Sequence, residues 1–311
     1  MARSLRYVPP HSLVEVTCRT LHGRFLLRPC RELNEIVLGI LGRAARRYRV
    51  GLCAFSYLSN HCHLLLRPLD ARHLARFMGF VNGNLAKEAG RLHGWRERIW
   101  GRRYTAIVVS HEEAVQLARL RYLLEQGTKE GLVRRPQDWP GAHSVQALID
   151  GCPMRGVWFD RTREYEARRC GQQPGKYEYA EEETVELAPL PAWDGLAPED
   201  RRAAVRALVR EIEREARRAR ETSGRSPMGV RRILRQNPHD RPEQSHRSPA
   251  PRFHAQAWRV RKSLELGYYE FRVRFRQAAE ELKLGRTGVE FPPGSFPPRL
   301  PFARAGPTPF Q

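Results

Sequence analysis

The sequence predicts an α+β fold: an antiparallel sheet with helices, followed by a mostly helical, partly disordered C-terminal extension. Two patterns in the first 130 residues support this prediction. Short runs that alternate apolar and polar residues are typical of strands, and longer stretches with apolar residues three and four apart are typical of helices. Their order, β-α-β-β-α-β-α, is that of a ferredoxin-like domain. We therefore expect such a catalytic domain over residues 1–150.

The individual elements follow from local signals. The expected strands are residues 13–20, 50–58, 61–67 and 105–109. The expected helices are residues 33–48, 74–92 and 111–127. Ser110 is suited to cap the start of the last helix and Gly127 to end it.

Two histidines bracket one small residue in a strand-like run. Alternate side chains of a strand share a face, so His61 and His63 project together. The intervening Cys62 points the other way, with Leu64 and Leu66, which we expect beneath helices. The histidines would then face the open side of the sheet and supply half of a metal site. The ordinary alternative is a pair of surface histidines.

A helix downstream brings a tyrosine and an amide to one face. Leu117, Leu120 and Leu124 form its apolar stripe at helical spacing. At about 100° per residue, Tyr122 and Gln126 lie opposite this stripe, and residues four apart are neighbours. Gln126 could then be a third metal ligand and Tyr122 a nucleophile. The ordinary alternative for Tyr122 is packing in the core with its hydroxyl hydrogen-bonded.

These motifs resemble those of the single-tyrosine HUH transposases, found in small bacterial insertion sequences and as REP-associated tyrosine transposases. The resemblance covers about residues 5–150 and rests on Asn-His-Cys-His-Leu-Leu-Leu at 60–66 and on the segment 121–139. His61 and His63 match the metal histidines of that family. Tyr122 matches its catalytic tyrosine, and Gln126 the amide that completes the metal site. REP-associated members usually have Asn-Pro there, whereas this chain has Gln-Gly.

The resemblance implies a metal-dependent DNA strand transferase, a transposase that cleaves and rejoins single-stranded DNA through a covalent 5′-phosphotyrosine. It implies Mg²⁺ or Mn²⁺ as cofactor, and two imidazoles with an amide suit Mn²⁺ better. The implied partner is DNA with single-stranded or hairpin ends. The alternatives are a rolling-circle replication initiator or relaxase, and a domesticated, non-catalytic binder of structured nucleic acid. Whether the tyrosine helix acts in cis or across a homodimer stays open.

The composition agrees with a polyanionic partner. The 311 residues carry 55 Lys and Arg against 34 Asp and Glu, a net charge of +21, which favours nucleic acid or an acidic membrane surface. No apolar run approaches the ~18 residues of a membrane span, so we expect a cytoplasmic protein without a membrane partner. Predicted nucleic-acid contacts are Arg102, Arg103, Arg121 and Asn60. The nearby aromatic residues Trp100 and Tyr104 either stack on bases or belong to the core.

The rest of the chain divides by composition. Residues 151–198 read as an irregular extension, 199–290 as an arginine-rich helical region with a mobile linker at 223–251, and 291–311 as a proline-rich tail. Arginines of the first helix and of the linker are expected to contact DNA: Arg206, Arg210, Arg214, Arg217, Arg220, Arg231, Arg232 and Arg235. A chain ending near Gly151 would then stay folded. The alternative is that this helix only covers the catalytic domain.

Overall fold

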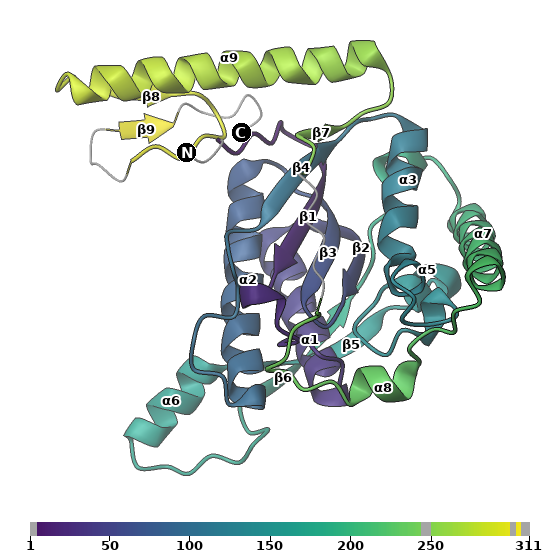
Figure 1. The fold of residues 1–311 in the computed structure, drawn as a ribbon. Coiled ribbons are helices and arrows are strands. Elements are labelled where there is room, and N and C mark those ends of the chain that lie inside the picture. The colour runs from purple at the N-terminus through teal and green to yellow at the C-terminus, as the bar shows by residue number, and fades with distance from the viewer. Residues whose placement is uncertain (1–4, 244–249, 299–302, 306–311) are drawn as a thin grey trace.

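A five-stranded sheet in the order β2-β3-β1-β4-β7 forms the centre of the protein (Figure 1). The computed structural model describes residues 5–243, 250–298 and 303–305. The strands are β1 Leu13–Arg19, β2 Gly51–Tyr57, β3 His61–Arg67, β4 Thr105–Val109 and β7 Phe253–His254. β1 pairs antiparallel with β3 and β4, as expected for a ferredoxin-like sheet. β7 joins β4 in parallel, so the sheet is mixed and its fifth strand comes from the C-terminal part.

The two predicted helices α1 Arg31–Tyr48 and α2 Ala71–His93 cover one face of this sheet. Cys62, Leu64 and Leu66 of β3 are buried with them in one apolar cluster. The alternation predicted for β3 is confirmed, because His61 and His63 therefore lie on the opposite face.

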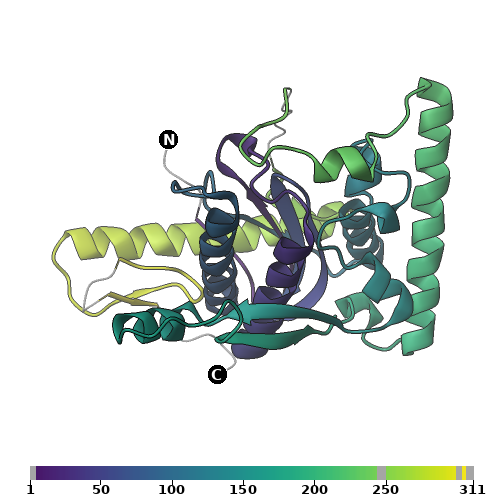
Figure 2. The same cartoon turned by 90° about the horizontal axis from the view of Figure 1, so that it is seen from below.

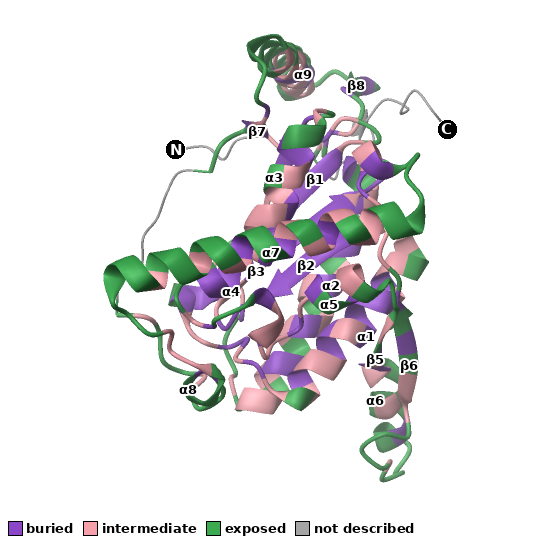
Figure 3. Cartoon of the chain, turned by 90° about the vertical axis from the view of Figure 1, so that its right-hand side faces the viewer, coloured by how far each residue is buried: buried purple, intermediate pink, exposed green. Residues whose placement is uncertain are grey.

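We expected that opposite face to be open, but in the structure helices cover it. α3 Glu113–Leu124 packs over it, followed outward by α5 Val145–Asp150 and α7 Pro198–Ser223. Figure 3 shows α7 lying across this side of the molecule with mostly exposed residues on its outer surface. The histidines thus lie in a layer between sheet and helix.

The tyrosine helix differs from its prediction at both ends. It begins at Glu113 after Glu112 rather than after Ser110, whose hydroxyl donates to the Glu112 carboxylate at 2.7 Å. It ends at Leu124 rather than at Gly127, which lies inside the following short helix α4 Gln126–Lys129. A Cβ on Gly127 would lie 3.0 Å from the Val133 side chain, so the glycine packs closely here rather than ending a helix.

Residues 151–198 are more regular than the sequence indicated. They form a hairpin of β5 Met154–Phe159 and β6 Ala180–Val185, with α6 Arg161–Arg169 between the strands and the 3₁₀ turn η3 Pro191–Trp193 after them. The hairpin packs on α1 through glycines. A Cβ built on Gly39 would lie 2.1 Å from the carbonyl carbon of Val157, so the two backbones touch directly.

The remaining elements are α8 Val230–Leu234, the long helix α9 Trp258–Lys283, and the paired strands β8 Val289–Phe291 and β9 Ala303–Ala305. Two further 3₁₀ turns are η1 Leu21–Gly23 and η2 Pro136–Asp138. Of the expected mobile linker, residues 244–249 lie outside the described residues, as do 299–302 and 306–311 of the expected proline-rich tail. None of the helices in the described ranges is long and apolar enough to cross a membrane.

Candidate active site

His61 and His63 lie side by side on β3, with ring centres 5.2 Å apart. His61 Nδ1 is 2.7 Å from Asn60 Oδ1, an atom that only accepts, so Nδ1 carries the hydrogen. His63 Nδ1 lies 3.3 Å from the Glu15 carboxylate and 3.2 Å from Thr17 Oγ1. Both rings are therefore fixed through Nδ1, which leaves the lone pair on each Nε2.

The tyrosine helix reaches the histidines of the same chain. The Tyr122 ring lies edge-on to His63, with centres 5.4 Å apart. Gln126 is buried, its Nε2 donates to the Tyr122 carbonyl oxygen at 2.8 Å, and its side chain contacts His61. The two residues expected opposite the apolar stripe are thus brought to the histidine pair.

A buried carboxylate that sequence analysis missed organises this cluster. Glu15 on β1 is 4% exposed and accepts two hydrogen bonds from Arg119, at 2.6 and 3.0 Å. Besides His63, it also meets Nε2 of His254 at 3.1 Å, and His254 belongs to β7. Arg119 in turn lies over the Tyr122 ring, with Cζ 4.1 Å from the ring centre. Glu15 therefore connects a histidine of the pair, the tyrosine and the C-terminal part of the chain.

Burial and charge set the protonation of the cluster. Burial, followed by the neighbouring His63 and Arg19, lowers the pKa of His61 to about 3, while its contact with Gln126 acts in the opposite direction. Burial alone would raise the pKa of Glu15, but hydrogen bonds from His254, His63 and Arg119 hold it well below its usual range. At neutral pH the cluster thus has a neutral His61 and an ionised Glu15.

The donor atoms fit a divalent cation. In the described part of the chain, no group of three or more His, Cys, Asp and Glu side chains is placed to hold a metal ion. The His pair has an amide beside it instead. Because Gln126 Nε2 donates to Tyr122, its amide oxygen remains to face His61. Two imidazole Nε2 atoms and one amide oxygen are all neutral lone-pair donors, a set suited to Mn²⁺ and compatible with Mg²⁺.

The residues predicted to contact nucleic acid have different environments. Arg102 and Arg103 are exposed on the loop before β4. Arg121 instead forms ion pairs with Glu125, Glu211 and Glu215, and so joins α3 to α7. Asn60 is engaged by His61 and donates to the Gly23 carbonyl oxygen.

The two aromatics of uncertain role pack against the core. The Trp100 indole donates to the Asn82 carbonyl oxygen at 2.9 Å. Tyr104 lies under the Arg6 guanidinium, 4.0 Å from the ring centre, and burial raises the pKa of its hydroxyl to about 12. Both side chains are thus held by intramolecular contacts.

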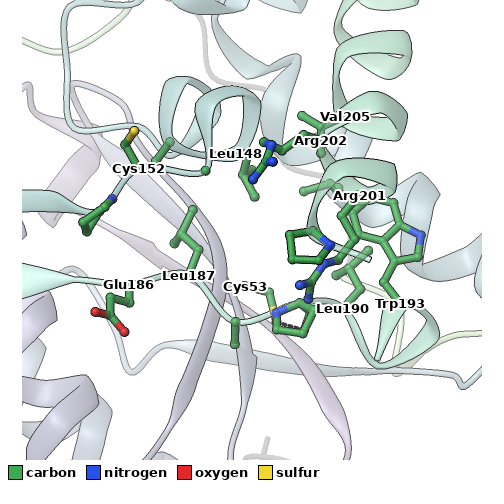
Figure 4. Close-up of a pocket in the computed structure, with 17 residues that line it drawn as sticks. Cys53, Leu148, Cys152, Glu186, Leu187, Leu190, Trp193, Arg201, Arg202 and Val205 are labelled. Atoms are coloured by element: carbon green, nitrogen blue, oxygen red, sulfur yellow. Dashed lines mark hydrogen bonds between the residues drawn. The ribbon is translucent and has the colours of Figure 1, made fainter. Parts of the chain in front are cut away.

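A separate cavity of about 350 Å³ lies between α5, α7 and residues 186–190 (Figure 4). Leu120 of α3 lines it, and at ~100° per residue this side chain points away from Tyr122. Burial raises the pKa of the Cys53 thiol in its wall to about 12, so this thiol stays protonated. Arg202 at its edge is paired with Glu199. The cavity offers no chemistry comparable with that of the histidine cluster.

No family model and no curated protein matches this chain. Among solved structures, it is similar to a REP-associated tyrosine transposase bound to a REP hairpin, at 15% identity and a TM-score of 0.39, over 48% of this chain and 86% of that one. It is also similar to a putative transposase from Deinococcus radiodurans R1, at 18% identity and a TM-score of 0.27, over 39% of this chain and 95% of that one.

Proposed function

We propose that this protein is a transposase that cuts and rejoins single-stranded DNA, with Tyr122 as the nucleophile. One observation supports this most directly: the Tyr122 ring lies against His63 while Gln126, one helical turn later, contacts His61. A phenol beside a neutral set of metal donors is the arrangement that phosphodiester cleavage by tyrosine needs. A structural tyrosine would not need the histidines and the amide to converge on it.

In this mechanism, the Tyr122 oxygen attacks the scissile phosphorus. The bond from phosphorus to Tyr122 forms as the bond to the 3′-oxygen breaks; the phenol proton is lost to solvent and the 3′-oxygen takes one up. The His61, His63 and Gln126 donors would hold a divalent cation, which would polarise the phosphoryl oxygen and orient the leaving group. Arg119 and Lys129, 4.1 and 4.9 Å from the centre of the Tyr122 ring, place positive charge beside the nucleophile, which favours the ionised phenol. Rejoining reverses the step and needs no external energy source.

The polarity of the covalent adduct tests the proposal. The full chain is incubated with Mn²⁺ and a pool of random-sequence single strands, labelled at either the 5′ or the 3′ end. The 3′ label should remain on the protein through denaturation, because the phosphate stays with Tyr122. The 5′ label should appear on free fragments with a 3′-hydroxyl that a polymerase can extend. DNA binding without any adduct would instead support the non-catalytic binder.

The metal site gives a prediction that does not depend on cleavage. His61→Ala and His63→Ala should each abolish measurable Mn²⁺ binding without DNA, because each removes one of two imidazole ligands. Gln126→Ala should weaken binding less, since water can replace a neutral amide. Glu15→Gln should weaken it by about 10- to 100-fold, because the partner that fixes the His63 ring loses its charge. Titration calorimetry or Mn²⁺ paramagnetic resonance measures these affinities.

The matched control is His73→Ala, because His73 is also paired with a carboxylate, Asp70, but lies on α2. Its Mn²⁺ affinity should equal that of the unaltered protein. Equal Mn²⁺ binding by the His63→Ala variant would mean that the cation is held elsewhere.

A further inference from the structure

Residues 228–240, which we call the strap, are fixed along one end of the active-site layer. Ile233 of α8 is fully buried in a cluster with Leu58, Val133 and Trp139. The amide nitrogens of Met228 and Gly229 donate to the carbonyl oxygens of residues 131 and 132, both at 2.9 Å. The strap belongs to the segment that the sequence indicated to be a mobile linker, yet it is anchored by apolar burial and backbone hydrogen bonds.

The strap runs beside the turn from which the histidine strand starts. Gln236 accepts a hydrogen bond from Ser59 at 2.6 Å, two residues before His61. Further along, the carbonyl oxygens of His239 and Asp240 accept from Arg24 and from the Phe25 amide. Figure 2 shows this segment, in green, continuing from α8 along the end of the sheet. The strap is therefore hydrogen-bonded to the turn that leads into the histidine strand.

The outer surface of the strap is basic along α8, and its one acid, the exposed Asp240, lies at the far end and accepts a hydrogen bond from Asn237. Arg231, Arg232 and Arg235 are exposed, and none forms an ion pair with another described residue. No Asp or Glu occurs from residue 225 to residue 239. Three uncompensated guanidinium groups on a fixed backbone form a surface that suits a row of phosphates.

The arginines of α7 differ, because acids are interspersed with them. Its acidic residues are Glu199, Asp200, Glu211, Glu213, Glu215 and Glu221. Arg206 pairs with Glu199 and Arg217 with Glu221, and Arg220 donates to the Arg134 carbonyl oxygen. Among the described residues, Arg210, Arg214 and Arg218 of α7 are also exposed and form no ion pair. They differ from the strap arginines because Glu211, Glu213 and Glu215 lie beside them on the same helix, whereas no acid neighbours the arginines of α8.

An aromatic side chain lies where the strap ends. The half-buried Trp95 meets the His239 ring, with centres 5.4 Å apart, and has Arg24 Cζ 5.2 Å from its ring centre. The exposed Arg96, Glu97 and Arg98 follow it and line, with Lys87 and Arg91, an open hollow of about 580 Å³. A half-buried tryptophan beside a hollow with several basic side chains is suited to stack on an unpaired base.

We propose that the strap and Trp95 together bind the single strand that is cut at Tyr122: Arg231, Arg232 and Arg235 hold consecutive phosphates, and Trp95 stacks on a base. This inference rests on the proposed function only in taking the bound strand to be the one that is cut; binding of a single strand to this surface does not require cleavage. The strap thereby makes the C-terminal part of the chain a component of the DNA-binding surface.

Salt dependence of binding in the full chain tests this surface. In a Tyr122→Phe background, so that DNA stays intact, affinity for a random single-stranded pool is measured by fluorescence anisotropy against salt concentration. Replacing Arg231, Arg232 and Arg235 together by Gln should reduce the slope of log affinity against log salt by about 2, at ~0.7 per phosphate. Replacing all three by Lys should keep the slope, because Lys retains the charge. Trp95→Ala should lower affinity by about tenfold with the slope unchanged.

The matched control replaces Arg210, Arg214 and Arg218 of α7 by Gln; these three are likewise exposed. Its slope should equal that of the parent protein. An unchanged slope in the strap Gln variant, an equal reduction in the α7 variant, or a reduced slope in the Lys variant would each overturn the proposal. Failure of the transposase chemistry would show separately, as absence of any adduct with the unaltered chain.

Discussion

Tyr122→Phe should abolish the covalent protein–DNA adduct while changing the affinity for single-stranded DNA by less than about threefold. The substitution removes one oxygen and leaves the ring, which keeps its edge contact with His63 and its place beneath Arg119. The metal-donor residues also stay in position, because Gln126 holds the Tyr122 carbonyl oxygen rather than its hydroxyl. The measurement is denaturing electrophoresis of the adduct with a 3′-labelled strand in Mn²⁺.

Tyr48→Phe is the matched control. Tyr48 ends α1 and packs against Phe80, so the same oxygen is removed on the far side of the sheet. Adduct yield should be unchanged in this variant. An adduct that persisted in the Tyr122→Phe variant would transfer the nucleophile's role to another tyrosine, which peptide mapping of the linked DNA would locate.

The parts of the site that sequence predicts are those set by local geometry. The alternation of a strand places His61 and His63 together whatever the strand pairs with. A spacing of four on a helix makes Tyr122 and Gln126 neighbours in the same way. The contact between that helix and the histidine strand joins residues about sixty apart, so spacing along the chain cannot predict it. The expectation that the two would meet rested on the motif resemblance.

The missed residues came from strands whose pairing is not local. Glu15 and Thr17 alternate with buried valines on β1, and Thr17 pairs with His63 across the sheet. Glu15 could therefore have been predicted as a site residue, because it is a lone acid on the same face of β1 as Thr17. His254 had no such signal, because β7 has only two residues and joins the sheet from the far end of the chain. The face we expected to be open is covered because α3 packs on it directly and α5 and α7 add further apolar residues.

A chain that ends at Gly151 should aggregate or lose its cooperative thermal transition, contrary to what the domain boundary at residue 150 suggested. Large apolar side chains from beyond that point are buried in both layers beside the sheet. They are Trp158, Phe159, Val185, Leu190, Trp193, Val205, Val209 and Ile212. At about 1.5–3 kcal/mol for each buried side chain, their loss exceeds ~10 kcal/mol. That is comparable with the whole stability of a domain, ~5–15 kcal/mol.

A chain that ends at Gly285 is the control for this truncation. It removes β8 and β9, and with them Val289 and Phe291, which pack with Ala278 in a small cluster on α9 apart from the central sheet. This shorter loss should leave a cooperative transition in circular dichroism and the Mn²⁺ affinity of the full chain, because β7 with His254 is retained. If the chain ending at Gly151 also melted cooperatively and bound Mn²⁺ as tightly, residues 152–311 would only cover a self-sufficient domain. The contact of His254 with Glu15 would then contribute nothing to the histidine pair.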